Sequence, residues 1–228
     1  IDTLRYDRLG VYSEEHVRTP HIDAFAARST VFDRAFAHNP TTLPSHTNIL
    51  TGTTPLYHGV HDNIGFRVAD EFQTLAEYLG DHGYESGAFV GAFPLDSRFG
   101  LNQGFDVYDD SHPTHHALDF FFAERKAEKV TESARDWLAA PREGPWFAFV
   151  HLFDPHHPYN PPEPFKSRYP EDFYSGEVAY VDQVLGDFFG WLAETGALGN
   201  TLVILTADHG EALGEKGEDT HSYFAYNN

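Results

Sequence analysis

The 228 residues contain no cysteine and no methionine. Without cysteine the chain has neither a disulfide framework nor a thiolate nucleophile, so its compartment cannot be inferred from redox chemistry. No apolar run approaches the roughly 20 residues of a membrane-spanning helix, and no signal peptide opens the chain. We expect a fragment truncated at both ends, so the localisation stays open, and a periplasmic or extracellular location is compatible with the sequence.

Basic residues are also scarce, with 15 Lys and Arg against 35 Asp and Glu and a formal net charge of -20. Nucleic acids and anionic membranes bind clustered Lys and Arg, so neither is an expected partner. A small sulfate or phosphate ester is still compatible with this charge if a cation and a few donors gather in a local pocket. The oligomeric state cannot be predicted from the sequence.

The spacing of apolar residues predicts helices and strands that alternate along the chain. Helices are predicted in the twenties, near residues 44–51, and over 74–79, 126–138 and 178–192, the last from apolar residues at 3 and 4 spacing. Strands are predicted over 30–37, 84–91, 146–153 and 202–206, and the apolar run 146–153 is expected to be buried on both faces of the sheet. Residues 97–118 are expected to be irregular, and five prolines between 155 and 164 predict a loop. This order favours one α/β domain over residues 1–228, with a mostly parallel central sheet and helices on both faces.

The segment LVILTADHGE, residues 202–211, carries the strongest functional signal. An apolar strand runs into Asp208 and His209, and functional groups in α/β sheets gather beyond the carboxyl ends of strands. Asp2, near the start of the chain, offers a third ligand. A histidine with two carboxylates suits manganese, zinc or iron better than calcium, which prefers oxygen ligands. We therefore expect one divalent metal ion bound by Asp2, Asp208 and His209.

Thr42 stands at a predicted helix start, in the segment TTLPSHTNILTG. The helix dipole and the backbone N–H groups there suit an anion. A threonine hydroxyl becomes a nucleophile at neutral pH only when a base or a metal activates it. Thr42 or Thr41 is otherwise a plain helix cap, and its position in the sequence does not separate these two interpretations.

Fifteen histidines are many for this length, and most are expected to be ordinary surface or hydrogen-bonding residues. The candidates for function lie on loops after strands or at helix starts, where they can exchange a proton with a leaving group. Asn63 shares such a position. These candidates are His46, Asn63, His156 and His221.

Five ordered blocks resemble the sulfatase family of the alkaline phosphatase superfamily, and the resemblance runs nearly end to end. The blocks are IDTLRYDRLG, the stretch from TPHIDAFAARS through PTTLPSHTNILTG, HGVHDN, DPHHPYNPP and LTADHGEALGEKGEDTH. The resemblance implies an alkaline phosphatase-like α/β fold and a metal-dependent ester hydrolase. The family's usual C-terminal antiparallel subdomain is expected to be missing from these 228 residues.

The resemblance also implies a role for each candidate residue. Asp2, Asp208 and His209 would bind the cation, and Thr42 would occupy the nucleophile position. His46 replaces the signature arginine on the substrate side. Asn63 and His221 would contact the non-bridging oxygens of the ester, with His221 at a position where many members have lysine, and His156 would stand near the leaving-group oxygen.

Departures from the family pattern bear on the reaction. Sulfatases convert a signature cysteine or serine to formylglycine, and Thr42 cannot be converted to that aldehyde. The chemistry of threonine favours a phosphorus ester, since a phospho-threonine can be hydrolysed by water, whereas the overall resemblance favours a sulfate ester. A second cation at Asp154, His156 and His157 lacks a further ligand, so one metal is expected.

Three functions therefore stay open. The first is a hydrolase of sulfate or phosphate mono- or diesters that uses Thr42 as its nucleophile. The second is a transferase that passes a phosphoryl group to an alcohol or lipid acceptor. The third is a protein that keeps the fold and binds a ligand without turnover.

Overall fold

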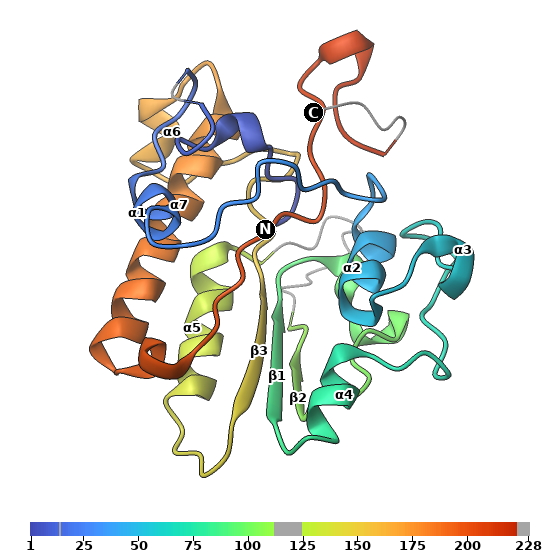
Figure 1. Cartoon of the computed structure of the whole chain (residues 1–228). Coiled ribbons are helices and arrows are strands. Elements are labelled where there is room, and N and C mark those ends of the chain that lie inside the picture. Colours follow the sequence, from blue (N-terminus) through green and yellow to red (C-terminus); the bar gives the residue numbers. More distant parts are fainter. Residues whose placement is uncertain (14, 112–124, 223–228) are drawn as a thin grey trace. The chain divides into compact units, whose positions relative to one another are not determined.

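The computed structural model describes residues 1–13, 15–111 and 125–222 (Figure 1). The chain divides into two compact units. The first unit combines Ile1–Ala37 with Asp154–Asn228, and the second is His38–Phe153. Neither this division nor the comparisons test the expectation of one domain, which stays a prediction. Across the described ranges, no helix combines the length and the apolar character that a bilayer crossing requires.

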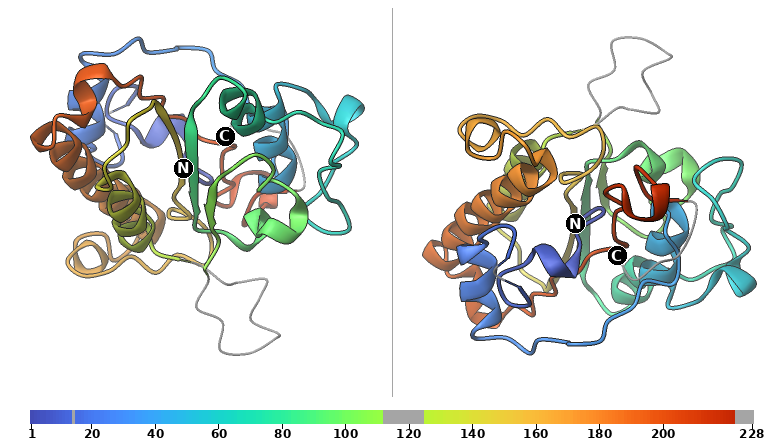
Figure 2. Two further views of the ribbon diagram at one scale, coloured as in Figure 1. Left: turned by 90° about the horizontal axis from the view of Figure 1, so that it is seen from below. Right: turned by 90° about the horizontal axis from the view of Figure 1, so that it is seen from above.

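The second unit is built on a three-stranded parallel sheet in the order β2-β1-β3. Its strands are β1 (Glu85–Val90), β2 (Val107–Asp109) and β3 (Trp146–His151). In the central strand, Ala88 is paired with Tyr108 on one side and Phe149 on the other. Helix α5 (Ala127–Leu138) packs on one face of the sheet and α4 (Leu75–Gly80) on the other (Figure 2). The predicted parallel sheet with helices on both faces is therefore confirmed.

Local sequence signals account for the helices of this unit. Thr74 and Glu77 form a capping box, in which each side chain accepts a hydrogen bond from the other residue's backbone and so fixes the start of α4. Two further helices are α2 (Thr42–Thr51) and α3 (Pro55–His58), and short 3-10 turns are Phe93–Leu95 and Ser97–Phe99. Leu43 and Leu50 of α2 enter a buried core with Val90 of β1. This core holds the start of α2 in place.

The first unit is organised around a long helix, α7 (Phe173–Glu194). The predicted apolar positions at 3 and 4 spacing are all buried on it, and Asp172 caps its start by accepting a hydrogen bond from the Ser175 N–H. Helix α1 (Pro20–Ala26) lies against α7, where Phe25 stacks on Phe189. The remaining elements are α6 (Phe165–Arg168) and the 3-10 turns Tyr6–Arg8, Ala197–Asn200 and Glu215–Gly217.

Four predictions about strands need correction. Residues 30–37 and 202–206 are not strands in the structure. The exposure of side chains alternates along residues 202–206, where Leu202 is 85% and Ile204 is 77% exposed. A strand also needs a hydrogen-bonded neighbouring strand, which the pattern of one segment cannot predict. Strand β2 was not predicted within 97–118, of which 112–118 lie outside the described residues. Residues Trp146–Val150 of β3 are only half-buried rather than buried on both faces, because β3 is an edge strand of this sheet.

Candidate functional site

Asp2, Asp208 and His209 lie together in the first unit, although they come from opposite ends of the sequence. The Nε2 atom of His209 is 3.3 Å from Asp208 Oδ2 and 3.7 Å from Asp2 Oδ1. One ligand atom from each of the three residues falls within 4.8 Å of the others, and all three side chains are buried. Such a cluster of one nitrogen and two carboxylates has the composition of a transition-metal site.

Thr3, the residue after Asp2, explains how Asp2 is held beside Asp208. Thr3 has φ of 51°, in the left-handed region that a β-branched residue rarely adopts. Its N–H donates to Asp208 Oδ1 at 3.2 Å, its hydroxyl donates to the carbonyl of Pro155, and its carbonyl accepts from the Tyr174 hydroxyl at 2.8 Å. A strained backbone conformation persists only when surrounding contacts stabilise it. These three hydrogen bonds hold Thr3 in place, and Thr3 in turn holds the neighbouring Asp2.

The charges in this group favour a cation. Burial, followed by the negative charge of Asp208, raises the pKa of Asp2, because two carboxylates in one buried site repel each other. The Nδ1–H of His209 donates to the Gly210 carbonyl at 2.9 Å, which leaves the Nε2 lone pair on the side of the carboxylates in the neutral ring. That Nε2 is buried and has no hydrogen-bond partner among the described residues. The donor set therefore fits a divalent cation.

Two further histidine rings lie beside this group. The ring of His221 is centred 4.7 Å from that of His209 and 4.9 Å from that of His156. Burial disfavours a charged His221, but its hydrogen bond to Glu211 and the negative charge of Glu211 outweigh burial, so the pKa of His221 is raised. Burial lowers the pKa of His156, and the nearby His221 acts in the same direction. Neighbouring groups whose pKa values are pushed apart are typical of acid and base pairs.

Thr42 is the first residue of α2 in the second unit, and it is 1% exposed. Thr41 is the N-cap residue, but its side chain makes no capping hydrogen bond, so neither threonine is explained as a side-chain cap. Asn63 takes part at this helix end instead, because its Oδ1 accepts a hydrogen bond from the Leu43 N–H at 2.7 Å. That bond orients the amide of Asn63 and leaves its NH₂ group as the donor for another acceptor.

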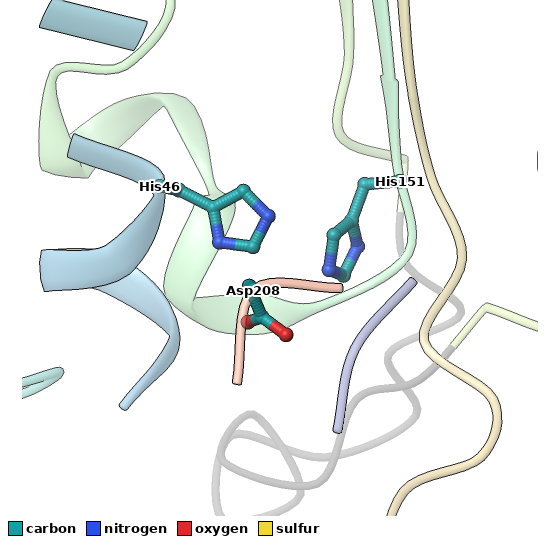
Figure 3. A group of neighbouring side chains, drawn as sticks. All are labelled: His46, His151 and Asp208. Atoms are coloured by element: carbon teal, nitrogen blue, oxygen red, sulfur yellow. The ribbon is translucent and has the colours of Figure 1, made fainter. Parts of the chain in front are cut away.

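His46 lies one helical turn after Thr42, and its Nδ1–H donates to the Thr42 carbonyl at 2.8 Å. Its ring and the ring of His151, at the end of β3, are centred 4.8 Å apart at an interplanar angle of 75° (Figure 3). Both side chains are buried. Within this unit, the neighbours of the His46 ring include the rings of His151 and Phe149.

The structure thus brings the sequence-predicted residues into two groups, one in each unit. Asp2, His156, Asp208, His209 and His221 are in the first unit, and Thr42, His46 and Asn63 are in the second. A site shared by the two groups stays a prediction. Among the described residues, Asp154, His156 and His157 do not form a three-ligand group, and the number of bound cations stays a prediction.

Two residues near these groups were not selected from the sequence. Glu211 is buried and binds His221, and its only sequence signal was its place in the DHGE segment. His151 was not selected either, although it follows an apolar run as Asp208 does. His58, by contrast, has a structural role, since it is hydrogen-bonded to Asn48 and accepts from the Val60 N–H.

Comparison with known proteins identifies the family. The sulfatase family model matches residues 1–227. The chain is 25% identical to an ulvan-active sulfatase of Formosa agariphila, over 93% of this chain and 50% of that protein, and 25% identical to the iduronate 2-sulfatase of Mus musculus, over 96% and 54%. It thus spans about half the length of these relatives.

A solved structure shows the same fold. The phosphonate monoester hydrolase of Agrobacterium radiobacter superposes with a TM-score of 0.78 at 20% identity, covering 99% of this chain and 64% of the other. A protein in the alkaline phosphatase superfamily from Vibrio parahaemolyticus also superposes, with a TM-score of 0.72 at 20% identity, covering 92% of this chain and 52% of the other, so the alkaline phosphatase-like α/β fold that the motifs implied is confirmed. Since the family model matches the chain almost from end to end, the protein belongs to the sulfatase family.

Proposed function

We propose that the protein is a metal-dependent hydrolase of sulfate or phosphate esters that uses Thr42 as its nucleophile. The observation that carries this proposal is the buried group of Asp2, Asp208 and His209, whose composition and charge fit a divalent cation. Family membership supports ester hydrolysis, and the similarity in fold to a phosphonate monoester hydrolase is compatible with a phosphorus ester. Because the chain spans half of its curated relatives, the reaction of the whole protein is part of the proposal.

The proposed metal site comprises Asp2, Asp208 and His209, with nitrogen and oxygen donors that suit manganese, zinc or iron better than calcium. When bound, the cation supplies positive charge that favours an ionised hydroxyl and stabilises an anionic transition state. The Thr42 hydroxyl sits at the start of α2, where the helix dipole also favours an anion. Thr42 is therefore the proposed attacking group.

In the proposed reaction, a bond forms between Thr42 Oγ and the phosphorus or sulfur atom while the bond to the departing ester oxygen breaks. Asn63 presents its NH₂ group for a non-bridging oxygen, and His221, whose raised pKa favours the charged form, presents its ring for the same kind of oxygen. His156 has a lowered pKa, so its protonated ring gives up a proton readily to the departing oxygen. Water then hydrolyses the ester of Thr42 and regenerates the hydroxyl.

A threonine nucleophile favours phosphorus over sulfur within this proposal. Hydrolysis of a phospho-threonine is a second displacement at phosphorus, which is an ordinary step for phosphate esters. A sulfo-threonine would require the same displacement at sulfur, and Thr42 cannot form the aldehyde hydrate that releases sulfate in other members. A preference for phosphate or for sulfate esters therefore distinguishes attack of Thr42 at phosphorus from attack at sulfur.

The test compares aryl phosphate mono- and diesters, a phosphonate monoester and an aryl sulfate as substrates of the purified protein loaded with manganese or zinc. Thr42→Ala should lower kcat by about 100-fold or more, because the attacking group is lost. The control is Thr51→Ala at the far end of the same helix, which should keep its activity. Unchanged turnover in Thr42→Ala would remove the proposed nucleophile, and full activity after chelation and in Asp208→Asn would remove the metal.

A further inference from the structure

Glu211 is fully enclosed and makes three hydrogen bonds through one oxygen. Its Oε1 accepts from His221 Nδ1–H at 3.0 Å, from the His221 backbone N–H at 2.6 Å and from the Thr220 hydroxyl at 3.1 Å. The side chain of Glu211 has no exposed area, and that of His221 is 10% exposed. A buried carboxylate that binds both the ring and the backbone of one residue restrains that residue strongly.

This restraint determines which ring nitrogen of His221 can act elsewhere. With Nδ1–H directed at Glu211, the Nε2 atom is the nitrogen that remains for a further partner. The ring is also flanked by two other imidazoles, with centroids at 4.7 Å for His209 and 4.9 Å for His156. These contacts leave the His221 ring one orientation beside the residues that carry the proposed chemistry.

The segment that carries Glu211 is itself anchored. Arg5 donates through Nη1 to the Glu211 carbonyl at 3.0 Å and to Glu215 Oε1 at 2.7 Å. The same guanidinium binds Asp7 through two nitrogens. Arg5 is 7% exposed, so its buried hydrogen bonds connect residues 211–215 to the segment that follows Asp2. The backbone of Glu211 is therefore held in place while its side chain binds His221.

We propose that Glu211 is a positioning residue that holds the His221 ring with Nε2 directed at the anionic oxygens of the bound ester. This inference rests on the proposed function, because it assigns the ligand of His221 to that ester. A purely structural Glu211 would tether Thr220 and His221 without any effect on how the ring nitrogens are used. The two interpretations differ in what happens when the ring bond alone is weakened.

The experiment uses Glu211→Ala and Glu211→Gln with Thr220→Val as the matched control. Thr220→Val removes one of the three bonds to Glu211, together with the 3.2 Å contact between the Thr220 hydroxyl and His221 Nδ1, but it keeps the bond between Glu211 and the ring. Its kinetics should therefore stay within about twofold of the wild-type protein, because the charge-assisted bond to the ring is the stronger one. Glu211→Ala should lower kcat by about 10- to 100-fold with the bound cation retained, as expected when the partner of a functional imidazole is lost. Glu211→Gln should recover part of that loss, because the amide oxygen still accepts from Nδ1–H.

A spectroscopic readout separates positioning from structural support. In the ¹⁵N spectrum of His221, recorded at a pH high enough for the spectrum itself to show a neutral ring, the wild-type protein should keep its proton on Nδ1, and Glu211→Ala should shift it toward Nε2. Equal losses in Thr220→Val and Glu211→Ala, or an unchanged nitrogen spectrum, would overturn the inference. Absence of ester hydrolysis in the wild-type protein would overturn the proposed function instead, and the spectrum would still judge the role of Glu211.

Discussion

Tyr174→Phe is the substitution that tests most directly how the Asp2 segment is held. The Tyr174 hydroxyl donates to the Thr3 carbonyl at 2.8 Å and accepts from the Arg5 N–H at 2.9 Å. The side chain is 2% exposed on α7, and phenylalanine keeps its ring in the same apolar cluster. The change therefore removes two hydrogen bonds and leaves the packing of the ring in place.

The expected cost follows from the two backbone groups that lose their partner. Each buried group left without a hydrogen bond costs about 1–3 kcal/mol, so the pair should cost about 2–6 kcal/mol. Thr3 sits at positive φ, which adds strain that its remaining contacts must offset alone. A loss of this size is a large part of the about 5–15 kcal/mol by which domains are stable. Asp2 should also become less well placed, so cation affinity should fall.

The assay is equilibrium unfolding in urea, followed by tryptophan fluorescence with and without cation, for which Trp191 on α7 is a reporter. Tyr78→Phe on α4 is the control, because its side chain is 51% exposed and its loss should change the free energy of unfolding by less than about 0.5 kcal/mol. If Tyr174→Phe unfolds at the same urea concentration as the control and binds cation equally well, the reasoning about Thr3 and Arg5 is wrong.

Three more predictions concern pH, a glycine and a helix cap. Because the pKa of Asp2 is raised in the folded protein, the cation-free protein loses stability as the pH rises from the usual aspartate pKa of about 3.9 through the raised pKa of Asp2. Zinc or manganese should therefore raise Tm more at about pH 7.5 than at about pH 4.5. Equal Tm shifts at the two pH values, or Tm shifts that persist in Asp2→Asn, would contradict this prediction. Gly104→Ala, at φ +80° with a Cβ 2.4 Å from a backbone nitrogen of α4, should cost more in urea unfolding than Gly83→Ala, which at φ +81° meets no atom within 4 Å and should cost about 1–2 kcal/mol. Asp182→Ala should cost about 1–3 kcal/mol in the same assay, since Asp182 accepts from the Ile22 N–H at 2.8 Å at the start of α1, and an unchanged midpoint would show that this cap is replaceable.

Local patterns predicted the helices better than the strands. The apolar spacing of α7 and the capping residues of α4 are properties of short segments, so they can be read from the sequence. Strands depend on a partner elsewhere in the chain, which is why residues 202–206 look like a strand and are not one. The three residues of β2 carry too short a pattern to predict, and only their pairing with Gly87, Ala88 and Phe89 defines them.

The candidate site divides in the same way. The Asp208-His209 pair after an apolar run is a local signal, and Asp2 was added to it as a candidate third ligand that the family resemblance then supported. What no local pattern contains is the link between them, a Thr3 N–H that donates to Asp208 Oδ1 at 3.2 Å. The role of Glu211 was missed for the same reason, since its partner His221 lies ten residues further on in a segment without regular structure.

The net charge of -20 gives these local arrangements a further consequence. An acidic surface repels an anionic ester, so attraction must come from the immediate surroundings of the site, where fields are least screened by salt. In the proposed site, positive charge beside the carboxylates would come from the cation and from His221, and Glu211 favours the charged form of that ring. The groups that bind the anion are then also those that stabilise its transition state. Removal of either source of positive charge should therefore affect KM and kcat together.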